Sequence, residues 1–198
     1  MKATERCFWV TEDPLYLQYH DQEWGVPVVD ETRLFEKLCL EGFQAGLSWL
    51  TILRKRENFR RAFAEFDLQT LARWGEKDVQ RLLRDAGIVR HEGKIRSTLQ
   101  NARRALELQA ETGSLAAHLW SFEPKARRPK GLTAAELKKI TTTAESVALS
   151  RDLRSRGWTF VGPTTAYALM QAMGMVNDHT IDCFRHAQVE KLHAGFMR

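Results

Sequence analysis

Apolar residues recur at intervals of three and four along this chain, whereas the apolar and polar alternation that marks a β-strand is nearly absent. The pattern therefore predicts an all-α fold. The first clear helix follows Asp30, a good N-cap residue, and ends before Gly46. Its stripe consists of Leu34, Leu38, Glu41 and Ala45. Ser48 can cap a second helix that runs to roughly Phe63.

Two further helices are predicted to form a hairpin over residues 78–106. The first covers residues 78–86, with Gly87 as the residue after its C-cap. The second begins near His91 and fades near Gly113. Its stripe consists of Ile95, Leu99, Ala102 and Leu106. Two helices joined by about four residues are typical of a helical hairpin.

The second half of the chain begins with an expected break. Residues 123–131 contain two prolines and four basic residues, which predicts an exposed connection. Thr133 and Glu136 fit a capping box for a short helix. Two longer helices are predicted over residues 144–156 and 163–174, and the second of these starts with a proline. The inward-facing candidates of the first are Val147, Leu149 and Leu153.

Length and charge narrow the class of protein. The 198 residues suit one hydrophobic core, or two helical lobes around one cleft, so we expect residues 1–198 to form a single compact unit. No apolar run approaches the ~20 residues that span a bilayer, and the start lacks the apolar stretch of a secretory signal. We therefore expect a cytoplasmic protein that does not bind membranes. The net charge of +5 favours a polyanionic partner such as DNA or RNA.

Two pairs of potential metal ligands stand near opposite ends of the chain, Cys7 with His20 and His179 with Cys183. A helix beginning near Asn177 would place the second pair one turn apart on one face. Cys2His2 is a common closed zinc set, which predicts a structural Zn²⁺ that joins the two ends. Each pair alone is weak, because a buried cysteine is usually plain packing. Two histidines of the tail are rival ligands, His186 and His193.

A carboxylate and a group of aromatic residues indicate a second site. Glu41 falls on the stripe of Leu34 and Leu38, where a charge is costly unless it has a partner. It is either a buried structural acceptor or a site residue. Five aromatic residues crowd the first quarter of the chain: Trp9, Tyr16, Tyr19, Trp24 and Trp49. Such rings could stack on an unstacked base beside a carboxylate, although aromatic clusters most often fill cores.

The turn DAGIVRHEGKI between the hairpin helices is a candidate DNA contact. The start of the second helix offers backbone N–H groups and a dipole that favours phosphate. Gly87, Arg90, His91 and Lys94 lie in this turn, and three of them add positive or potentially positive charge. Helical hairpins usually just pack, so simple packing is the alternative.

Several long motifs occur together in this chain. They are ERCFWV, DPLYLQYHDQEWGVP, LCLEGFQAGLSW, ILRKRENFRRAF, DAGIVRHEGKI, GWTFVGPTTAYALMQAMGMVNDH and a terminal H-x3-C. Together they resemble the 3-methyladenine DNA glycosylase I family over about residues 5–184. The resemblance implies an all-helical fold of the helix-hairpin-helix glycosylase superfamily, with zinc tying the termini. The turn departs from the commoner L-P-G-V-G form of that superfamily, and the tail after Cys183 matches no motif.

The resemblance also implies roles for single residues. The metal ligands fall on Cys7, His20, His179 and Cys183. The base-contacting carboxylate falls on Glu41. The aromatic pocket falls on Trp9, Tyr16, Tyr19, Trp24 and Trp49. The phosphate-binding turn falls around Gly87, Arg90, His91 and Lys94.

The implied function is excision of N3-methyladenine from double-stranded DNA that contains alkylated bases. We expect hydrolysis without strand cleavage, by a monomer. The stretch after the hairpin has Gln109 and Ala110 where many superfamily members have an aspartate. One alternative is a glycosylase with an added lyase step, for which Lys94 is the only candidate near the hairpin. The other is a non-catalytic, zinc-stapled helix-hairpin-helix module that binds DNA.

Overall fold

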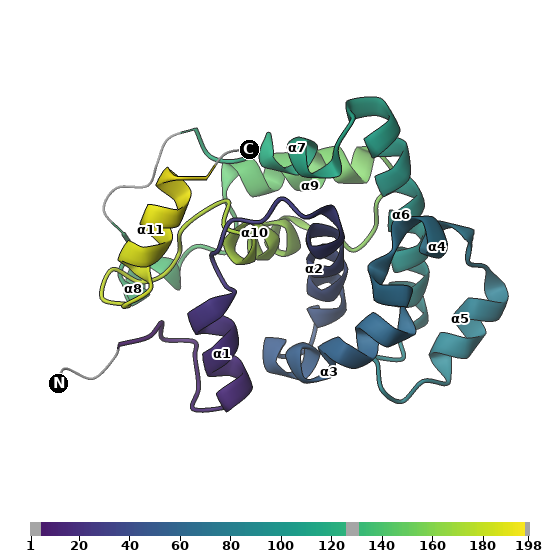
Figure 1. Cartoon of the computed structure of the whole chain (residues 1–198), viewed down its shortest axis with the longest axis horizontal. Coiled ribbons are helices and arrows are strands. Elements are labelled where there is room, and N and C mark those ends of the chain that lie inside the picture. Colours follow the sequence, from purple (N-terminus) through teal and green to yellow (C-terminus); the bar gives the residue numbers. More distant parts are fainter. Residues whose placement is uncertain (1–4, 126–130, 197–198) are drawn as a thin grey trace.

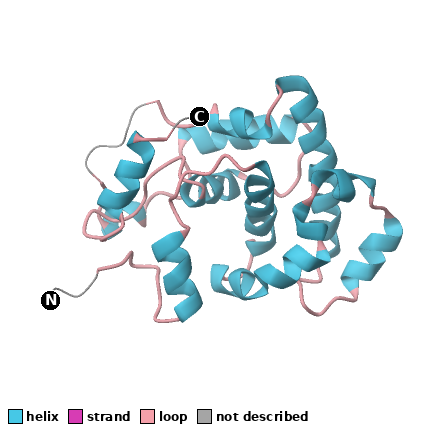
Figure 2. Cartoon of the chain, in the orientation of Figure 1, coloured by secondary structure: helices cyan, strands magenta, loops and turns pink. Residues whose placement is uncertain are grey.

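The computed structural model describes residues 5–125 and 131–196, and every regular element within them is a helix (Figure 2). The prediction of an all-α fold is confirmed. In chain order the helices are α1 (Pro14–Gln22), α2 (Glu31–Gln44), α3 (Trp49–Ala62), the 3-10 turn η1 (Ala64–Phe66), α4 (Leu68–Arg73), α5 (Glu76–Leu83), α6 (Glu92–Thr112), α7 (Leu115–Trp120), α8 (Ala134–Leu137), α9 (Ala144–Ser155), α10 (Pro163–Ala172) and α11 (His186–Ala194).

Helix α2 lies in the middle of the molecule and contacts α3, α6, α7 and α10 (Figure 1). Its N-cap is Asp30, whose carboxylate accepts from the Arg33 amide at 2.8 Å, as predicted. Burial is continuous from Leu34 to Phe43, because neighbouring helices cover all of its faces. The expectation of a single inward stripe was therefore too narrow. Ala45, placed on that stripe, is exposed and lies outside the helix.

Side-chain caps fix most of the other predicted helix starts. Ser48 caps α3, Thr133 caps α8 with a reciprocal bond from Glu136, and Pro163 opens α10. The predicted inward residues of α9 are buried at Leu149 and Leu153, while Val147 is only half-buried.

Helices α5 and α6 pack against one another and are joined by residues 84–91, which we call the α5–α6 turn. His91 caps α6, and Gly113 closes it with a left-handed φ of 83°, as predicted. The prediction for Gly87 is wrong: α5 ends at Leu83, and Gly87 is not in the left-handed region. A Cβ there would lie 2.9 Å from Asp85 Oδ1, which accepts from the Gly87 amide at 2.7 Å. Gly87 is thus required for a close turn rather than for a helix end.

One prediction for the end of the chain is wrong. The predicted helix beginning near Asn177 does not form, because residues 177–185 make a series of turns and α11 starts only at His186.

Other predictions concern the rest of the chain. Much of the predicted connection over residues 123–131 falls outside the described residues. The short helices α1, α4 and α7 and the tail helix α11 were not anticipated. None of the helices in the described part of the chain has both the length and the apolarity needed to cross a bilayer.

Candidate active site and metal cluster

A cavity of about 210 Å³ opens between α1, α2, α3 and α10. It brings together all six residues predicted for a base pocket: Trp9, Tyr16, Tyr19, Trp24, Trp49 and Glu41. Glu41 comes from the core of α2, and Trp49 from the first residue of α3. The turn between these two helices therefore sets the position of the carboxylate relative to the indole.

The aromatic residues form a continuous lining. The rings of Trp9 and Trp24 are 4.9 Å apart in an edge-to-face arrangement, and Trp9 and Tyr16 are 5.2 Å apart. Tyr19 and Trp49 follow at 5.4 Å. Burial and the nearby Glu41 carboxylate raise the pKa of Tyr19 well above its usual value, so its hydroxyl keeps its proton. The lining thus offers flat apolar faces and neutral hydroxyls around the Glu41 carboxylate.

Glu41 is 6 % exposed and does not stand alone. The Lys37 ammonium, one helical turn earlier, lies 2.8 Å from Glu41 Oε1 and donates to the Tyr19 hydroxyl at 2.7 Å. Lys37 also lies over the Trp49 ring, 3.3 Å from its centroid. Burial lowers the pKa of Lys37, and the attraction of Glu41 opposes that shift. Sequence reasoning missed Lys37, although the i, i+4 spacing to Glu41 was a usable signal.

Other lining residues were also missed. Phe8, Gln44, Leu137, Ala168, Gln171 and Asp178 complete the wall. Asp178 is a second buried carboxylate, which accepts from Tyr167 at 2.5 Å and from Gln171 at 2.8 Å. It follows α10 in a turn-rich segment, so no helical periodicity marked it beforehand.

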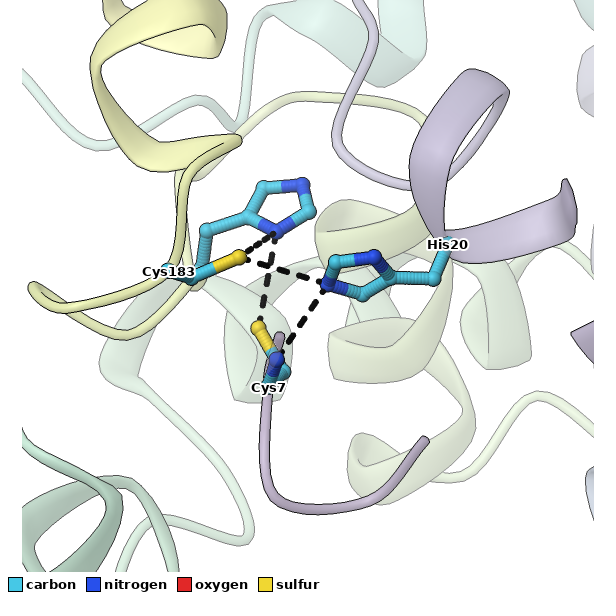
Figure 3. A group of neighbouring side chains, drawn as sticks. Cys7, His20 and Cys183 are labelled. Atoms are coloured by element: carbon cyan, nitrogen blue, oxygen red, sulfur yellow. Dashed lines mark hydrogen bonds between the residues drawn. The ribbon is translucent and has the colours of Figure 1, made fainter. Parts of the chain in front are cut away.

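The four predicted metal ligands converge although they come from opposite ends of the chain, as Figure 3 shows for Cys7, His20 and Cys183. All four, including His179, are buried, and their ligand atoms lie within 4.8 Å of one another. Cys183 Sγ is 3.4 Å from His20 Nε2 and 3.5 Å from His179 Nδ1, and Cys7 Sγ is 3.5 Å from His179 Nδ1. The cluster could hold one metal ion. The rival residues His186 and His193 are not part of it.

The surroundings of the cluster orient its ligands. His20 Nδ1 lies 2.8 Å from Asp21, whose carboxylate is also held by Arg6, and His179 Nε2 lies 3.0 Å from the Trp24 carbonyl oxygen. Such partners fix the ring orientation of metal-binding histidines. Hydrogen bonding from Cys7, and then from the two histidines, lowers the pKa of Cys183 well below its usual value. The cluster therefore favours a thiolate, the form that binds metal.

The α5–α6 turn lies away from the cavity, at the lower right of Figure 1. Arg90, His91 and Gly93 are exposed there, and Arg90 makes no ion pair within the described residues. The Lys55 ammonium, from α3, donates to the carbonyl oxygens of Ala86 and Gly87 at 3.0 and 3.1 Å. The turn is therefore anchored to α3, with Arg90 free to face a partner.

Lys94 differs from the other residues predicted for this turn. Its side chain is 6 % exposed, and its ammonium donates to the carbonyl oxygens of Phe43 and Ala45 at 2.8 and 2.6 Å. A cation at this place satisfies carbonyls at the C-terminal end of α2. The expectation that Lys94 adds charge to the surface of the turn is thus not met, because its charge is used inside the protein.

Solved structures share this arrangement of helices. The crystal structure of a 3-methyladenine DNA glycosylase I has a TM-score of 0.87 and 49 % identity, and the match covers 92 % of this chain and all of that one. The Staphylococcus aureus 3-methyladenine DNA glycosylase I, solved to show 3-methyladenine recognition, also has a TM-score of 0.87, with 36 % identity over 93 % of this chain and 97 % of that one. The fold is thus that of a DNA glycosylase, and the expectation of such an enzyme is confirmed.

Sequence comparisons agree. A model described as methyladenine glycosylase matches residues 9–186. The Escherichia coli (strain K12) DNA-3-methyladenine glycosylase 1 is 50 % identical over 180 residues, which cover 90 % of this chain and 95 % of the relative. The Haemophilus influenzae DNA-3-methyladenine glycosylase is 42 % identical over 91 % of this chain and 97 % of the relative. The chain belongs to the methyladenine glycosylase family.

Proposed function

We propose that this glycosylase excises N3-methyladenine from double-stranded, alkylated DNA, by hydrolysis and without strand cleavage. The observation that carries the proposal is the cavity itself, in which five aromatic residues surround the buried carboxylate of Glu41. A flipped base needs stacking faces and a few polar groups at its edge. The names of the relatives support 3-methyladenine as that base.

The charge of the damaged base explains the role of the Glu41 carboxylate. N3-methylation makes the adenine of the nucleotide cationic and therefore a good leaving group, so recognition is the main task. Flipping costs a few kcal/mol, and less for a damaged base than for a well-stacked one. Glu41 then accepts a hydrogen bond from the base edge and opposes its charge. Neutral adenine lacks that attraction.

Water, rather than a lysine, completes the reaction. Departure of the base leaves an oxocarbenium-like sugar, which water attacks. A lyase would need a lysine nucleophile at that sugar. The ammonium of Lys94, the one candidate from the turn, is buried and already donates to two backbone carbonyls. This contact disfavours the lyase alternative.

DNA binding is assigned to the α5–α6 turn. Gly87 permits the tight turn, Arg90 and His91 provide exposed positive or potentially positive groups, and α6 starts at the exposed Glu92 and Gly93. Backbone N–H groups at a helix start suit phosphate. Lys94 is left out of this interface, because its side chain points into the protein. We expect the enzyme to act as a monomer.

The four buried ligands fit a structural Zn²⁺. Zn–S bonds of about 2.3 Å and Zn–N bonds of about 2.0 Å at a tetrahedral angle place sulfur and nitrogen about 3.5 Å apart. Three of the four sulfur–nitrogen pairs of the cluster lie at 3.4, 3.5 and 3.5 Å. Cys7, His20, His179 and Cys183 would fill all four positions, so the ion would stabilise the fold and take no part in the chemistry.

One experiment tests the proposed reaction. The purified protein is incubated with DNA treated with a methylating agent, the released bases are identified by chromatography, and the strands are sized on a denaturing gel. Free 3-methyladenine with intact strands is the expected result. Released base with strand scission supports the lyase, and tight binding with no released base supports the DNA-binding module.

A further inference from the structure

Lys37 lies behind the wall of the cavity and contacts three of the residues that form it. It does not itself line the cavity. Its ammonium is 2.8 Å from Glu41 Oε1, 2.7 Å from the Tyr19 hydroxyl and 3.3 Å from the centroid of the Trp49 ring. A side chain so placed can influence a bound base through those three residues and through the charge of its ammonium.

Two carboxylates near Lys37 are already matched by arginines. On the side away from the cavity, Arg56 donates to both carboxylate oxygens of Glu23 at 2.6 and 2.9 Å, and Arg60 donates to Glu36 at 2.9 Å. Lys37 is thus left to balance Glu41, and both members of the pair are 6 % exposed. A buried lysine without such a partner would be costly.

We propose that Lys37 is a positioning and specificity-determining residue, the resident counter-ion of the Glu41 carboxylate. This inference rests on the proposed recognition of a cationic base by Glu41. The pair neutralises the charge of Glu41, holds Oε1 in place and leaves the second carboxylate oxygen for the base. The ammonium also occupies one face of Trp49, so that face is not available to a cationic ligand.

Neutralisation of Glu41 changes how the enzyme discriminates between bases. With Glu41 alone, attraction of the full negative charge would favour any cationic purine. With Lys37 beside it, part of this attraction is cancelled, and hydrogen bonding and stacking carry more of the selectivity. Lys37 therefore lowers the affinity for the cation, which allows the base to be held without being bound too tightly to leave.

The test is a double-mutant cycle over Lys37→Met, Glu41→Gln and the combined variant. Two probes are titrated while tryptophan fluorescence is followed: N3,N9-dimethyladeninium, which keeps its charge, and neutral 3-methyladenine. Lys37→Met should bind the cation about tenfold more tightly, with the neutral probe changed less than about threefold, because one unit charge several ångströms away has been removed. Glu41→Gln removes the attraction and should cost about tenfold in either background, because the effects of two fixed charges on a third are additive. The combined variant should therefore bind the cation about as tightly as the wild type.

The combined variant guards against misfolding, since it leaves no unpaired buried charge. An unchanged affinity of the Lys37→Met variant for the cation, or equal changes for both probes, would overturn the proposal. Failure of the proposed function is a separate result. Wild-type protein that releases no 3-methyladenine from methylated DNA contradicts the reaction, whereas the cycle measures the effects of the two charges from ligand binding alone.

Discussion

Two buried charges at the cavity, Lys37 and Glu41, form a matched pair that carries a cost in stability when it is split. Lys37 and Glu41 are both 6 % exposed, and Arg60 neutralises Glu36 nearby. Removing one member of a buried pair leaves the other uncompensated, which typically costs ~3–5 kcal/mol. A residue of the active site can thus also be a residue that stabilises the core.

Glu41→Gln should greatly reduce excision of 3-methyladenine and also lower the free energy of unfolding by roughly 3 kcal/mol, because Lys37 loses its partner. The deficit should depend on pH. Burial already holds the pKa of Lys37 below its usual value, so the unfolded chain binds more protons than the folded one. Stability of the variant should therefore rise with pH toward about 10, as Lys37 becomes neutral in both states.

Denaturant melts between pH 7 and 10, combined with base-release assays on methylated DNA, check this prediction. The control is the Lys37→Met, Glu41→Gln variant, which should lack the pH dependence. A Glu41→Gln protein that excises 3-methyladenine at the wild-type rate would remove Glu41 from recognition.

Close contact with the backbone of a distant segment requires glycine at position 174. It follows α10 with a φ of +74°, and a Cβ there would lie 2.5 Å from the Pro27 nitrogen and 2.7 Å from the Gly25 oxygen. Gly174→Ala should destabilise the fold by more than about 3 kcal/mol, since rigid backbone must move. Gly113→Ala has a similar φ of +83° with open space and should cost only about 1 kcal/mol. Thermal melts of both variants separate the effect of the backbone clash from the effect of the left-handed φ. Equal losses of stability in the two variants would contradict the proposed clash at Gly174.

Elements with local signals were predictable from the sequence. Asp30 and Ser48 start helices through their own side chains, and Gly113 ends one through its backbone freedom. The segment 177–185 was predicted to be helical, yet it forms turns while still bringing His179 to Cys183. Contacts with distant parts of the chain determine the conformation of that segment. One of them is the hydrogen bond from the Phe184 amide to the Glu5 carbonyl oxygen. Such contacts leave no periodic pattern in the local sequence.

The same limit applies to the candidate site. Aromatic residues and Glu41 stood out as side-chain types, so their gathering could be predicted with the help of the resemblance. Lys37 was hidden, because a lysine on a helix is normally a surface residue. Lys94 was misjudged for the same reason: its ammonium meets the end of α2, which only the packing of α6 against α2 reveals.

Two residues at the α5–α6 turn are expected to act on DNA binding in different ways: Arg90 by contacting phosphate, and Lys55 by holding the turn in position. Arg90→Met should weaken binding to undamaged duplex and reduce the salt dependence of binding by about one unit in the log–log slope. Lys55→Met removes the ammonium from the Ala86 and Gly87 carbonyls, so it should weaken binding several-fold while leaving the slope nearly unchanged. Arg151→Met, on α9, is the control and should change neither quantity. Fluorescence anisotropy over a range of salt gives all three, and an unchanged slope for Arg90→Met would remove that residue from the interface.

On the scale of the whole molecule, the cluster of two cysteines and two histidines connects the N-terminal segment and α1 to the turns before α11. Cys7 and His20 lie at one end of the sequence, and His179 and Cys183 at the other. These residues lie close to the cavity. Trp9, Trp24 and Asp178, which line the cavity, are within four residues of a cluster member in the sequence. Holding the ends together therefore also holds three parts of the cavity wall.

Removal of the metal should consequently affect both stability and ligand binding. Purified protein is expected to contain one Zn²⁺ by elemental analysis. Cys183→Ala should lose it and become less stable by about 4 kcal/mol or more, a melting temperature lower by roughly 8–16 °C for a chain of this size. Cys39→Ala is the matched control: Cys39 is also buried but lies on α2, away from the cluster, so its variant should keep the full zinc content.

Before it unfolds, the Cys183→Ala protein should also bind 3-methyladenine more weakly, because Trp9 and Trp24 are no longer held. Well-folded wild-type protein without zinc, or a Cys183→Ala variant with wild-type stability, would show that the four side chains are only a packed core.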